Sequence, residues 1–251
     1  MDTIRIDHDT RVLVLTGAGV SAESGVPTFR DANGLWEGHN VEDVASPEGF
    51  ARDPALVWRF YSDRRVAADK VAPNPGHHAL AALEDRLGDR FLLATQNVDG
   101  LHLRAGSQRV VQMHGNLYTT RCSVCDLSPF DDHRAYPPEA LPRCPQCAAR
   151  GRDSLLRPHI VWFGEMLDPG DLRRIRDFMR AADGHRFIFL AAGTSGLVYP
   201  AAGMVDQARE CGAETWLVNL EVPANRSRFR HGVEGRSGEV LPRLFTYDAT
   251  A

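Results

Sequence analysis

The sequence has no apolar run near the roughly 20 residues that cross a bilayer, and its first residues lack the basic and apolar blocks of a secretory leader. It has a single lysine, Lys70, so almost all of its positive charge is arginine, which we interpret as compositional bias. Its net charge of −4 gives no positive excess for a general nucleic-acid grip. These absences predict a cytoplasmic protein without a membrane anchor or a specific nucleic-acid partner.

The composition and the pattern of apolar residues indicate the fold class. The 251 residues suffice for one large domain or one with an insertion, and 43% apolar with 25% charged residues favours a packed core. Fully apolar runs alternate with helical stretches and lie at residues 11–16, 91–95, 110–113, 187–192 and 215–218. Such runs are typical of parallel strands buried on both faces, so we predict an α/β fold with helices on both faces of a parallel sheet.

Two segments interrupt this alternation. Residues 35–73 contain a predicted helix that begins at Pro54, and residues 116–158 hold four cysteines, several prolines and little periodicity. We expect these insertions, one helical and one metal-binding, to form a small second domain. The remaining segments are expected to form the sheet domain: residues 1–34, 74–115 and 159–251.

The turn after the first apolar run carries Gly17, Gly19 and Ala22 in the spacing of a dinucleotide-binding loop. Such glycines let the backbone approach a pyrophosphate at a helix N-terminus, although a glycine turn without a ligand is also open. The acidic residue expected about 20 positions later is missing, because residues 27–36 are predicted to be a loop. A standard dehydrogenase is therefore disfavoured, and Asn219 and Glu221 are the candidates for a ribose contact.

Four of the five cysteines form two pairs, Cys122 with Cys125 and Cys144 with Cys147, separated by 18 residues. Four thiolates at this spacing fill a tetrahedral zinc shell and leave no position for water. The pattern predicts one structural Zn²⁺ in a module too small for a core of its own, with two disulfides or an iron–sulfur cluster as alternatives. Cys211 stands apart and is expected to be a buried structural thiol.

Polar residues follow two neighbouring runs, Asn97 and Asp99 after one and His114 after the next. Ligands bind at the carboxyl edge of parallel sheets, where these residues are predicted to lie. A single histidine is more often structural, and this chain has ten. Because His114 is predicted beside the glycine loop, we treat it as a candidate general base.

Together these motifs resemble those of the sirtuins, the NAD-dependent protein-lysine deacylases. The similar segments follow the family's order over residues 11–245: GAGVSAESGVPTFR at 17–30, TQNVDGLH at 95–102, HGN at 114–116, the two cysteine pairs, PHIVWFGE at 158–165, GTS at 193–195 and NLE at 219–221. The resemblance implies a Rossmann-like large domain, a zinc-ribbon small domain, and a cleft between them for NAD and an acyl-lysine peptide.

The resemblance also implies residue roles toward NAD: the glycine loop holds the pyrophosphate, a loop covers the nicotinamide ribose, and the end of a late strand contacts the adenosine. The residues expected to bind NAD are Gly17, Ala18, Gly19, Ser21, Ala22, Thr28, Phe29, Arg30, Trp36, Gln96, Asn97, Asp99, Gly193, Thr194, Ser195, Asn219, Glu221 and Ser237.

In the mechanism that the resemblance implies, the acyl-lysine carbonyl oxygen attacks the ribose carbon as nicotinamide leaves. Asn97 and His114 are expected to be catalytic, and His114 accepts a proton through the ribose hydroxyls. The products are free lysine, nicotinamide and O-acyl-ADP-ribose. The substrate peptide is expected to add as a strand between two loops, with contacts from Val161, Phe163 and Gly164.

Tyr61 and Arg64 lie three residues apart on the predicted helix and so share a face. A half-exposed aromatic beside a solvated arginine would explain them. However, a Tyr-x-x-Arg pair together with residues 22–30 resembles the desuccinylase and demalonylase type of sirtuin. A guanidinium and a phenol hydroxyl can bind a carboxylate, so we expect a preference for succinyl and malonyl groups, with acetyl removal as a weaker activity.

Two other functions would use the same motifs. A zinc-ribbon module could bind NAD as a signal without turnover, and an enzyme could transfer ADP-ribose to a protein. If acyl peptide stimulates nicotinamide release, the protein is a deacylase and not an NAD-binding module without turnover. Protein labelled with ADP-ribose would identify the transferase. An oxidoreductase is the least favoured, because the ribose acid and a paired hydride-transfer site are missing.

Overall fold

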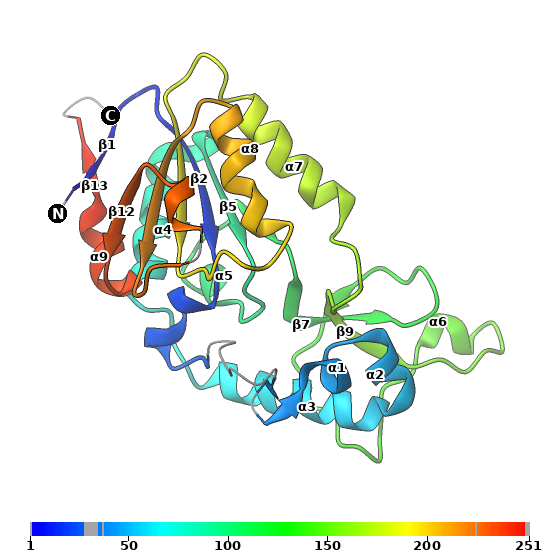
Figure 1. Ribbon diagram of the computed structural model, residues 1–251. Coiled ribbons are helices and arrows are strands. Elements are labelled where there is room, and N and C mark those ends of the chain that lie inside the picture. The colour runs from blue at the N-terminus through cyan, green and yellow to red at the C-terminus, as the bar shows by residue number, and fades with distance from the viewer. Residues whose placement is uncertain (1, 28–34, 37, 224, 249–251) are drawn as a thin grey trace.

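The computed structural model describes residues 2–27, 35–36, 38–223 and 225–248. The chain forms a larger lobe built on a parallel sheet and a smaller lobe at the lower right of Figure 1. No helix in the described ranges is both long and apolar enough to span a membrane.

Among the described residues, six parallel strands form the central sheet of the larger lobe, in the order β12–β11–β10–β2–β5–β6. Their bounds are Arg11–Thr16 (β2), Phe91–Thr95 (β5), Val110–Gln112 (β6), Phe187–Ala192 (β10), Glu214–Asn219 (β11) and His231–Glu234 (β12). The five predicted strands are confirmed within a residue at each end. β12 was not predicted, because this half-exposed edge strand has no continuous apolar run.

Helices cover both faces of this sheet, as predicted. Successive strand residues point to opposite faces, so Val12 and Val14 enter one core while Leu13 and Leu15 enter the other. The helices α4 (Pro75–Leu87) and α9 (Ser237–Leu244) pack on the first face, and α7 (Pro169–Arg180) and α8 (Met204–Glu210) pack on the second (Figure 1). The parallel α/β fold predicted from the sequence is therefore confirmed.

Short elements complete the larger lobe. The strands β1 (Ile4–Ile6) and β13 (Phe245–Tyr247) pair with each other and bring the two ends of the chain together. The other short helices are α5 (Leu101–Arg104) and the 3-10 helices η1 (Ala18–Val20), η2 (Ala22–Ser24), η3 (Gly88–Arg90), η4 (Ala201–Gly203) and η5 (Arg226–Arg228).

The smaller lobe combines helices with an antiparallel sheet in the order β8–β7–β9. Its strands are Gly115–Cys122 (β7), Phe130–Asp131 (β8) and Leu156–Ile160 (β9), with a hairpin of Leu35–Trp36 (β3) and His39–Asn40 (β4). Its helices are Val41–Val44 (α1), Pro47–Arg52 (α2), Pro54–Asp69 (α3) and Pro145–Ala148 (α6). The predicted helix start at Pro54 is confirmed, and the Asp53 carboxylate caps it by accepting from the Leu56 amide at 2.9 Å.

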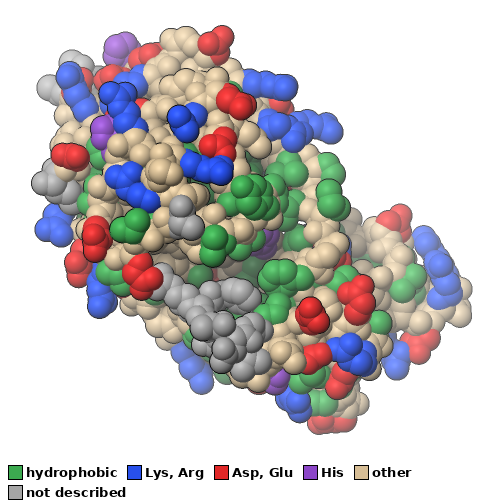
Figure 2. All heavy atoms as spheres, in the orientation of Figure 1, with side chains coloured by type: hydrophobic (Ala, Val, Ile, Leu, Met, Phe, Trp, Pro, Cys, Tyr) green, Lys and Arg blue, Asp and Glu red, His purple; other side chains and the backbone are tan. Residues whose placement is uncertain are grey.

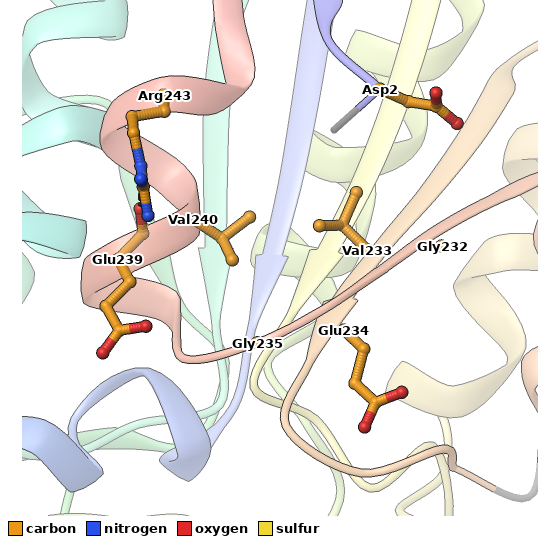
Figure 3. A pocket seen from close by; sticks show the side chains of 8 residues that line it. All are labelled: Asp2, Gly232, Val233, Glu234, Gly235, Glu239, Val240 and Arg243. Carbon is orange, nitrogen blue, oxygen red and sulfur yellow. Dashed lines mark hydrogen bonds between the residues drawn. The ribbon is translucent and has the colours of Figure 1, made fainter.

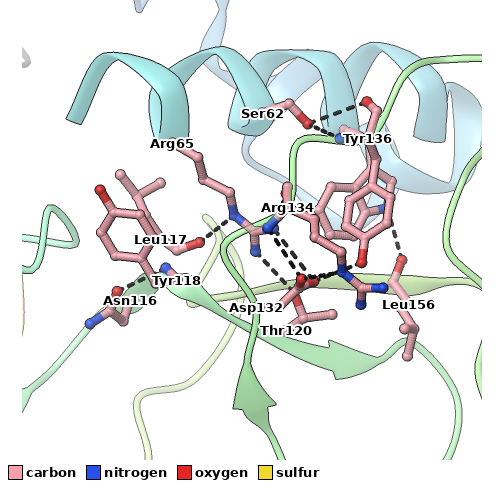
Figure 4. Close-up of polar contacts among 11 residues, drawn as sticks. Ser62, Arg65, Asn116, Leu117, Tyr118, Thr120, Asp132, Arg134, Tyr136 and Leu156 are labelled. Carbon is pink, nitrogen blue, oxygen red and sulfur yellow. Dashed lines mark hydrogen bonds and ion pairs between the residues drawn. The ribbon is translucent and has the colours of Figure 1, made fainter. Parts of the chain in front are cut away.

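A buried ionic network fixes α3 against β7 (Figure 4). The Arg65 guanidinium donates to the Leu117 carbonyl at 2.6 Å and to Thr120 Oγ1 at 2.9 Å, and it pairs with the Asp132 carboxylate at 3.5 Å. A buried charge is tolerated only with such partners, so these contacts offset the loss of water around the Arg65 guanidinium and join α3 to β7. Nothing in the spacing of Arg65 distinguishes it from Arg64, the half-buried arginine that precedes it.

Candidate active site

The predicted site residues meet at the carboxyl edge of the central sheet. Gly17 follows β2, Gln96 follows β5, and Gly193 follows β10. The loops are joined by hydrogen bonds, since Gln96 Nε2 donates to Thr194 Oγ1 at 3.2 Å and Asn219 Nδ2 donates to the Thr194 carbonyl at 3.1 Å. This edge is where open parallel sheets bind ligands.

The glycine loop packs directly on the loop after β10. The Gly19 amide donates to the Gly193 carbonyl at 2.8 Å, and a Cβ at Gly17 or Gly19 would lie only 2.8 Å from that oxygen. The helix N-terminus expected at this loop belongs to a 3-10 helix and not to an α-helix: the loop continues as η1 and η2, and η2 ends at Gly25, whose φ is 89°. The backbone amides of this loop therefore belong to short turns rather than to a long helix.

Ser21 joins two of the predicted residues to a histidine that sequence reasoning missed. Its Oγ donates to Asp99 Oδ2 at 2.7 Å and accepts from Asn97 Nδ2 at 3.1 Å. His77 Nε2 lies 3.3 Å from the same oxygen, and His77 Nδ1 accepts from the Asn74 amide, so the His77 proton is on Nε2. Burial lowers the pKa of His77 to about 4 and raises the pKa of Asp99. The helix cap at Asn74 was the available signal for His77.

His114 has the tautomer that a base requires. Its Nδ1 lies 3.0 Å from the Gln96 carbonyl oxygen, which can only accept, so Nδ1 carries the proton and Nε2 keeps a free lone pair. Burial lowers the pKa of His114, and the Gln96 hydrogen bond opposes this only in part. The imidazole is therefore neutral at physiological pH.

The pH dependence of turnover follows from this shift. A base with a lowered pKa stays unprotonated below the ordinary value of about 6.5, so kcat/KM is expected to fall only when the pH drops through a midpoint below 6.5. The measurement is kcat/KM against pH, together with an NMR titration of the His114 imidazole. If the pH profile and the NMR titration share a midpoint at or above 6.5, the lowered pKa of His114 is contradicted.

The four paired cysteines form one cluster. Their sulfur atoms all lie within 4.8 Å of one another, with Cys122 3.8 Å from Cys147 and Cys125 3.6 Å from Cys144, and none is in a disulfide. A tetrahedral zinc ion with Zn–S bonds of about 2.3 Å places its sulfur atoms about 3.8 Å apart. The donor set therefore fits one structural Zn²⁺, as predicted, and it does not fit the alternative of two disulfides.

The cysteine cluster is far from the candidate base. The strand β7 begins directly after His114 and ends at Cys122, and at roughly 3.3 Å per residue it spans more than about 20 Å. Four thiolates also leave no coordination position for a substrate. The zinc would thus hold the smaller lobe together and take no part in the reaction.

Tyr61 and Arg64 lie on α3, three residues apart. The Tyr61 side chain is fully buried, so a half-exposed aromatic does not describe it, and its hydroxyl accepts from Trp162 Nε1 at 2.9 Å. The Arg64 guanidinium lies 3.2 Å above the Phe60 ring and 5.1 Å from the Trp36 ring. Arg64 Nη1 donates to the Phe60 carbonyl of its own helix at 2.8 Å. Burial raises the pKa of the Tyr61 phenol, and the nearby Arg64 charge opposes this rise.

The other predicted residues occupy varied environments. Asn219 and Ser237 are buried, and the Gly235 amide donates to the Asn219 carbonyl at 3.0 Å, which places the start of α9 beside the end of β11. Trp36, Val161 and Ala18 are half-buried. The predicted site residues that are exposed are Ala22, Ser195, Glu221, Phe163 and Gly164. Thr28, Phe29 and Arg30 lie outside the described residues.

A separate pocket of about 470 Å³ lies between β12 and α9 (Figure 3). β12 is at the opposite edge of the central sheet from β6, the strand that precedes His114. Three carboxylates (Asp2, Glu234 and Glu239) and one guanidinium (Arg243) line it, so its net negative charge disfavours the phosphates of a dinucleotide. The sheet edge offers what such a ligand needs: closely packed glycines and buried amide and hydroxyl groups. The residues present therefore fit NAD at the edge and not in this pocket.

The fold and the site together define a Rossmann-like dinucleotide-binding protein with an inserted metal-binding lobe. The profile of the Sir2 family matches residues 17–200. The NAD-dependent protein deacylase of Shewanella oneidensis is 47% identical over 240 residues, which is 93% of this chain and 92% of the relative. The protein of the same name from Escherichia coli strain K12 is 50% identical over 236 residues, or 93% and 80%.

Comparison with solved structures points to the same family. A structure described as a Sir2 homolog–NAD complex superposes with a TM-score of 0.82 at 40% identity and covers 93% of this chain and 87% of its own. This chain belongs to the Sir2 family, the sirtuins. The resemblance predicted from the sequence motifs is confirmed.

Proposed function

We propose that this chain removes acyl groups, preferably succinyl and malonyl groups, from protein lysines with NAD as co-substrate. It is a Sir2-family member whose relatives are named NAD-dependent protein deacylases, and it is itself an NAD-dependent protein deacylase. The acyl preference and the residue roles below are the proposal. The observation that carries the catalytic assignment is His114, which has a free Nε2 at the sheet edge shared with the glycine loop.

NAD would supply the ribose that receives the acyl group and the nicotinamide that leaves. His114 Nε2 would accept a proton from a ribose hydroxyl, since Nδ1 is occupied by the Gln96 carbonyl. Asn97 and Asp99 line the nicotinamide side, and Ser21 fixes both through its hydroxyl. These buried, mutually bonded side chains are oriented before the substrate arrives, which avoids reorganisation during the reaction.

The rest of the NAD site follows the sheet edge. The backbone of Gly17 to Ala22 would hold the pyrophosphate, with Thr194 and Ser195 beside it. Asn219, Glu221 and Ser237 would contact the adenosine end, where the Gly235–Asn219 hydrogen bond brings α9 close.

The buried Tyr61 hydroxyl supports an acidic acyl group. It accepts from Trp162, but no residue in the described ranges accepts its own hydrogen. A buried donor without an acceptor is unfavourable by about 1–3 kcal/mol. A carboxylate on the acyl chain would accept this hydrogen beside the Arg64 guanidinium, whereas an acetyl group would not.

Replacing Arg64 by methionine tests the acyl preference. The ratio of kcat/KM on succinyl-lysine to that on acetyl-lysine peptides is expected to fall about 10- to 100-fold, because hydrogen bonds to charged groups contribute about 1.5–3 kcal/mol. Arg59→Met is the matched control, since Arg59 is an exposed arginine on the same helix. A wild-type enzyme that prefers acetyl peptide, or an equal effect of both variants, would exclude this pocket.

The peptide would bind as an extended strand between residues 163–164 and 196–199. Phe163, Leu197 and Tyr199 are 54%, 67% and 68% exposed. Figure 2 shows hydrophobic side chains on both sides of a hollow between the lobes, with a histidine side chain inside it. The Val161 amide donates to the His114 carbonyl at 2.9 Å, which ties one peptide loop to the base. Backbone pairing reads little sequence, so we expect many protein lysines to be substrates.

Nicotinamide release distinguishes this function from NAD binding alone. Release is expected to increase when acyl-lysine peptide is added, with O-acyl-ADP-ribose as the second product. Release without stimulation by peptide, or radiolabel transferred from NAD to protein, would contradict deacylation.

A further inference from the structure

The orientation of the Tyr61 hydroxyl is set by a residue 101 positions further along the chain. The Trp162 indole Nε1 donates to Tyr61 Oη at 2.9 Å, and both side chains are buried. A phenol oxygen that accepts from one side must direct its own hydrogen elsewhere. The indole therefore excludes one orientation of the O–H group and leaves the hydrogen pointing away from Trp162.

Trp162 is itself held in place by an ion pair. The Arg157 guanidinium lies 3.3 Å above the indole ring and makes two hydrogen bonds to Glu165, Nη1 to Oε1 at 2.7 Å and Nη2 to Oε2 at 3.0 Å. Glu165 Oε2 also accepts from the Trp162 backbone amide at 2.9 Å. A paired and stacked guanidinium of this kind fixes the plane of the ring beneath it.

The charge states of these groups suit a neutral donor. Burial raises the pKa of the Tyr61 phenol well above its ordinary value, so the hydroxyl keeps its proton. Burial also favours protonation of Glu165, but hydrogen bonds from Arg157 and the Trp162 amide hold its pKa below the ordinary range. Arg157 is thus balanced by its own partner and leaves the Tyr61 hydroxyl free to serve a ligand.

We propose that Trp162 is a positioning residue for acyl specificity: its indole N–H turns the Tyr61 O–H toward the carboxylate of the acyl group, and the Arg157–Glu165 pair holds the indole. The inference rests on the proposed preference for acidic acyl groups. An acetyl group has no carboxylate to receive the hydrogen. Trp162 therefore acts on the binding of succinyl-lysine and not on the chemistry at the ribose.

The test is Trp162→Phe, which keeps a ring beneath Arg157 and removes the N–H donor. The KM for a succinyl-lysine peptide is expected to rise about five- to tenfold with kcat little changed, the scale of one neutral hydrogen bond. The succinyl-to-acetyl ratio of kcat/KM should fall by the same factor. In a Tyr61→Phe background, Trp162→Phe should produce no further change in that ratio, because the hydroxyl it orients is absent.

Trp58→Phe is the matched control. Trp58 is a buried tryptophan of the same lobe, and its Nε1 donates to the Leu156 carbonyl at 2.9 Å rather than to Tyr61. Its replacement removes an equivalent hydrogen bond and should leave the ratio unchanged. If Trp162→Phe does not fold, as judged by thermal unfolding, Arg157→Lys replaces it and should lower the ratio, since lysine cannot bind Glu165 through two donors.

Equal losses on both peptides, or a full effect of Trp162→Phe without the Tyr61 hydroxyl, would overturn the inference. The two hypotheses fail separately. If Tyr61→Phe leaves the ratio unchanged, the acidic-acyl preference itself is wrong. If Tyr61→Phe lowers the ratio and Trp162→Phe does not, the preference stands and the role of Trp162 is refuted.

Discussion

Replacing His114 by alanine is expected to lower kcat/KM by about 10²- to 10⁴-fold, the range that general acid–base catalysis contributes. The His114 imidazole provides the unprotonated Nε2 at the sheet edge, because its Nδ1 is held by the Gln96 carbonyl. Among the described residues, no other histidine makes this contact. The measurement is nicotinamide formation with a succinyl-lysine peptide at saturating NAD.

The fold should survive this substitution, because His114 is half-buried and contributes one side-chain hydrogen bond. Zinc content and the melting temperature are expected to match those of the wild type. His133→Ala is the control, since His133 is an exposed histidine that stacks on Tyr118. Near-normal turnover of His114→Ala would remove this residue from the mechanism.

Replacing Cys144 by serine is expected to unfold the smaller lobe and abolish turnover. The buried Cys144 sulfur belongs to the cluster of four, and binding of structural zinc contributes about 10–16 kcal/mol to the folding of small zinc modules. Zinc content should fall from one ion per chain to nearly none, with loss of protease resistance in residues 116–158. Loss of turnover would follow, because β7 and β9 of this lobe border His114 and the peptide loop.

Cys211→Ser is the matched control, since Cys211 lies outside the cluster and packs against the core of the larger lobe. It should retain zinc and activity. Full zinc content and turnover in Cys144→Ser would show that the four sulfur atoms do not form a required metal site.

Much of the larger lobe could be predicted because its signals are local. An apolar run of five or six residues specifies a doubly buried strand, and the residue after it reaches the binding edge by sheet geometry alone. The helix N-terminus expected at the glycine loop is that of a short 3-10 helix, because Gly25 ends this segment after two short turns. The division into domains at residues 35–73 and 116–158 stays a prediction.

The sequence by itself determined the family, the parallel sheet, the metal-binding cysteines and the candidate base His114, because each depends on residue types at short, regular spacing. Only the tertiary structure decided which distant side chains contact and orient the residues of the site and of the smaller lobe. His77 reaches Ser21 across 56 positions, Arg65 reaches Asp132 across 67, and Trp162 reaches Tyr61 across 101. Such contacts join distant segments through burial and hydrogen-bond pairing, and no periodicity along the chain records them.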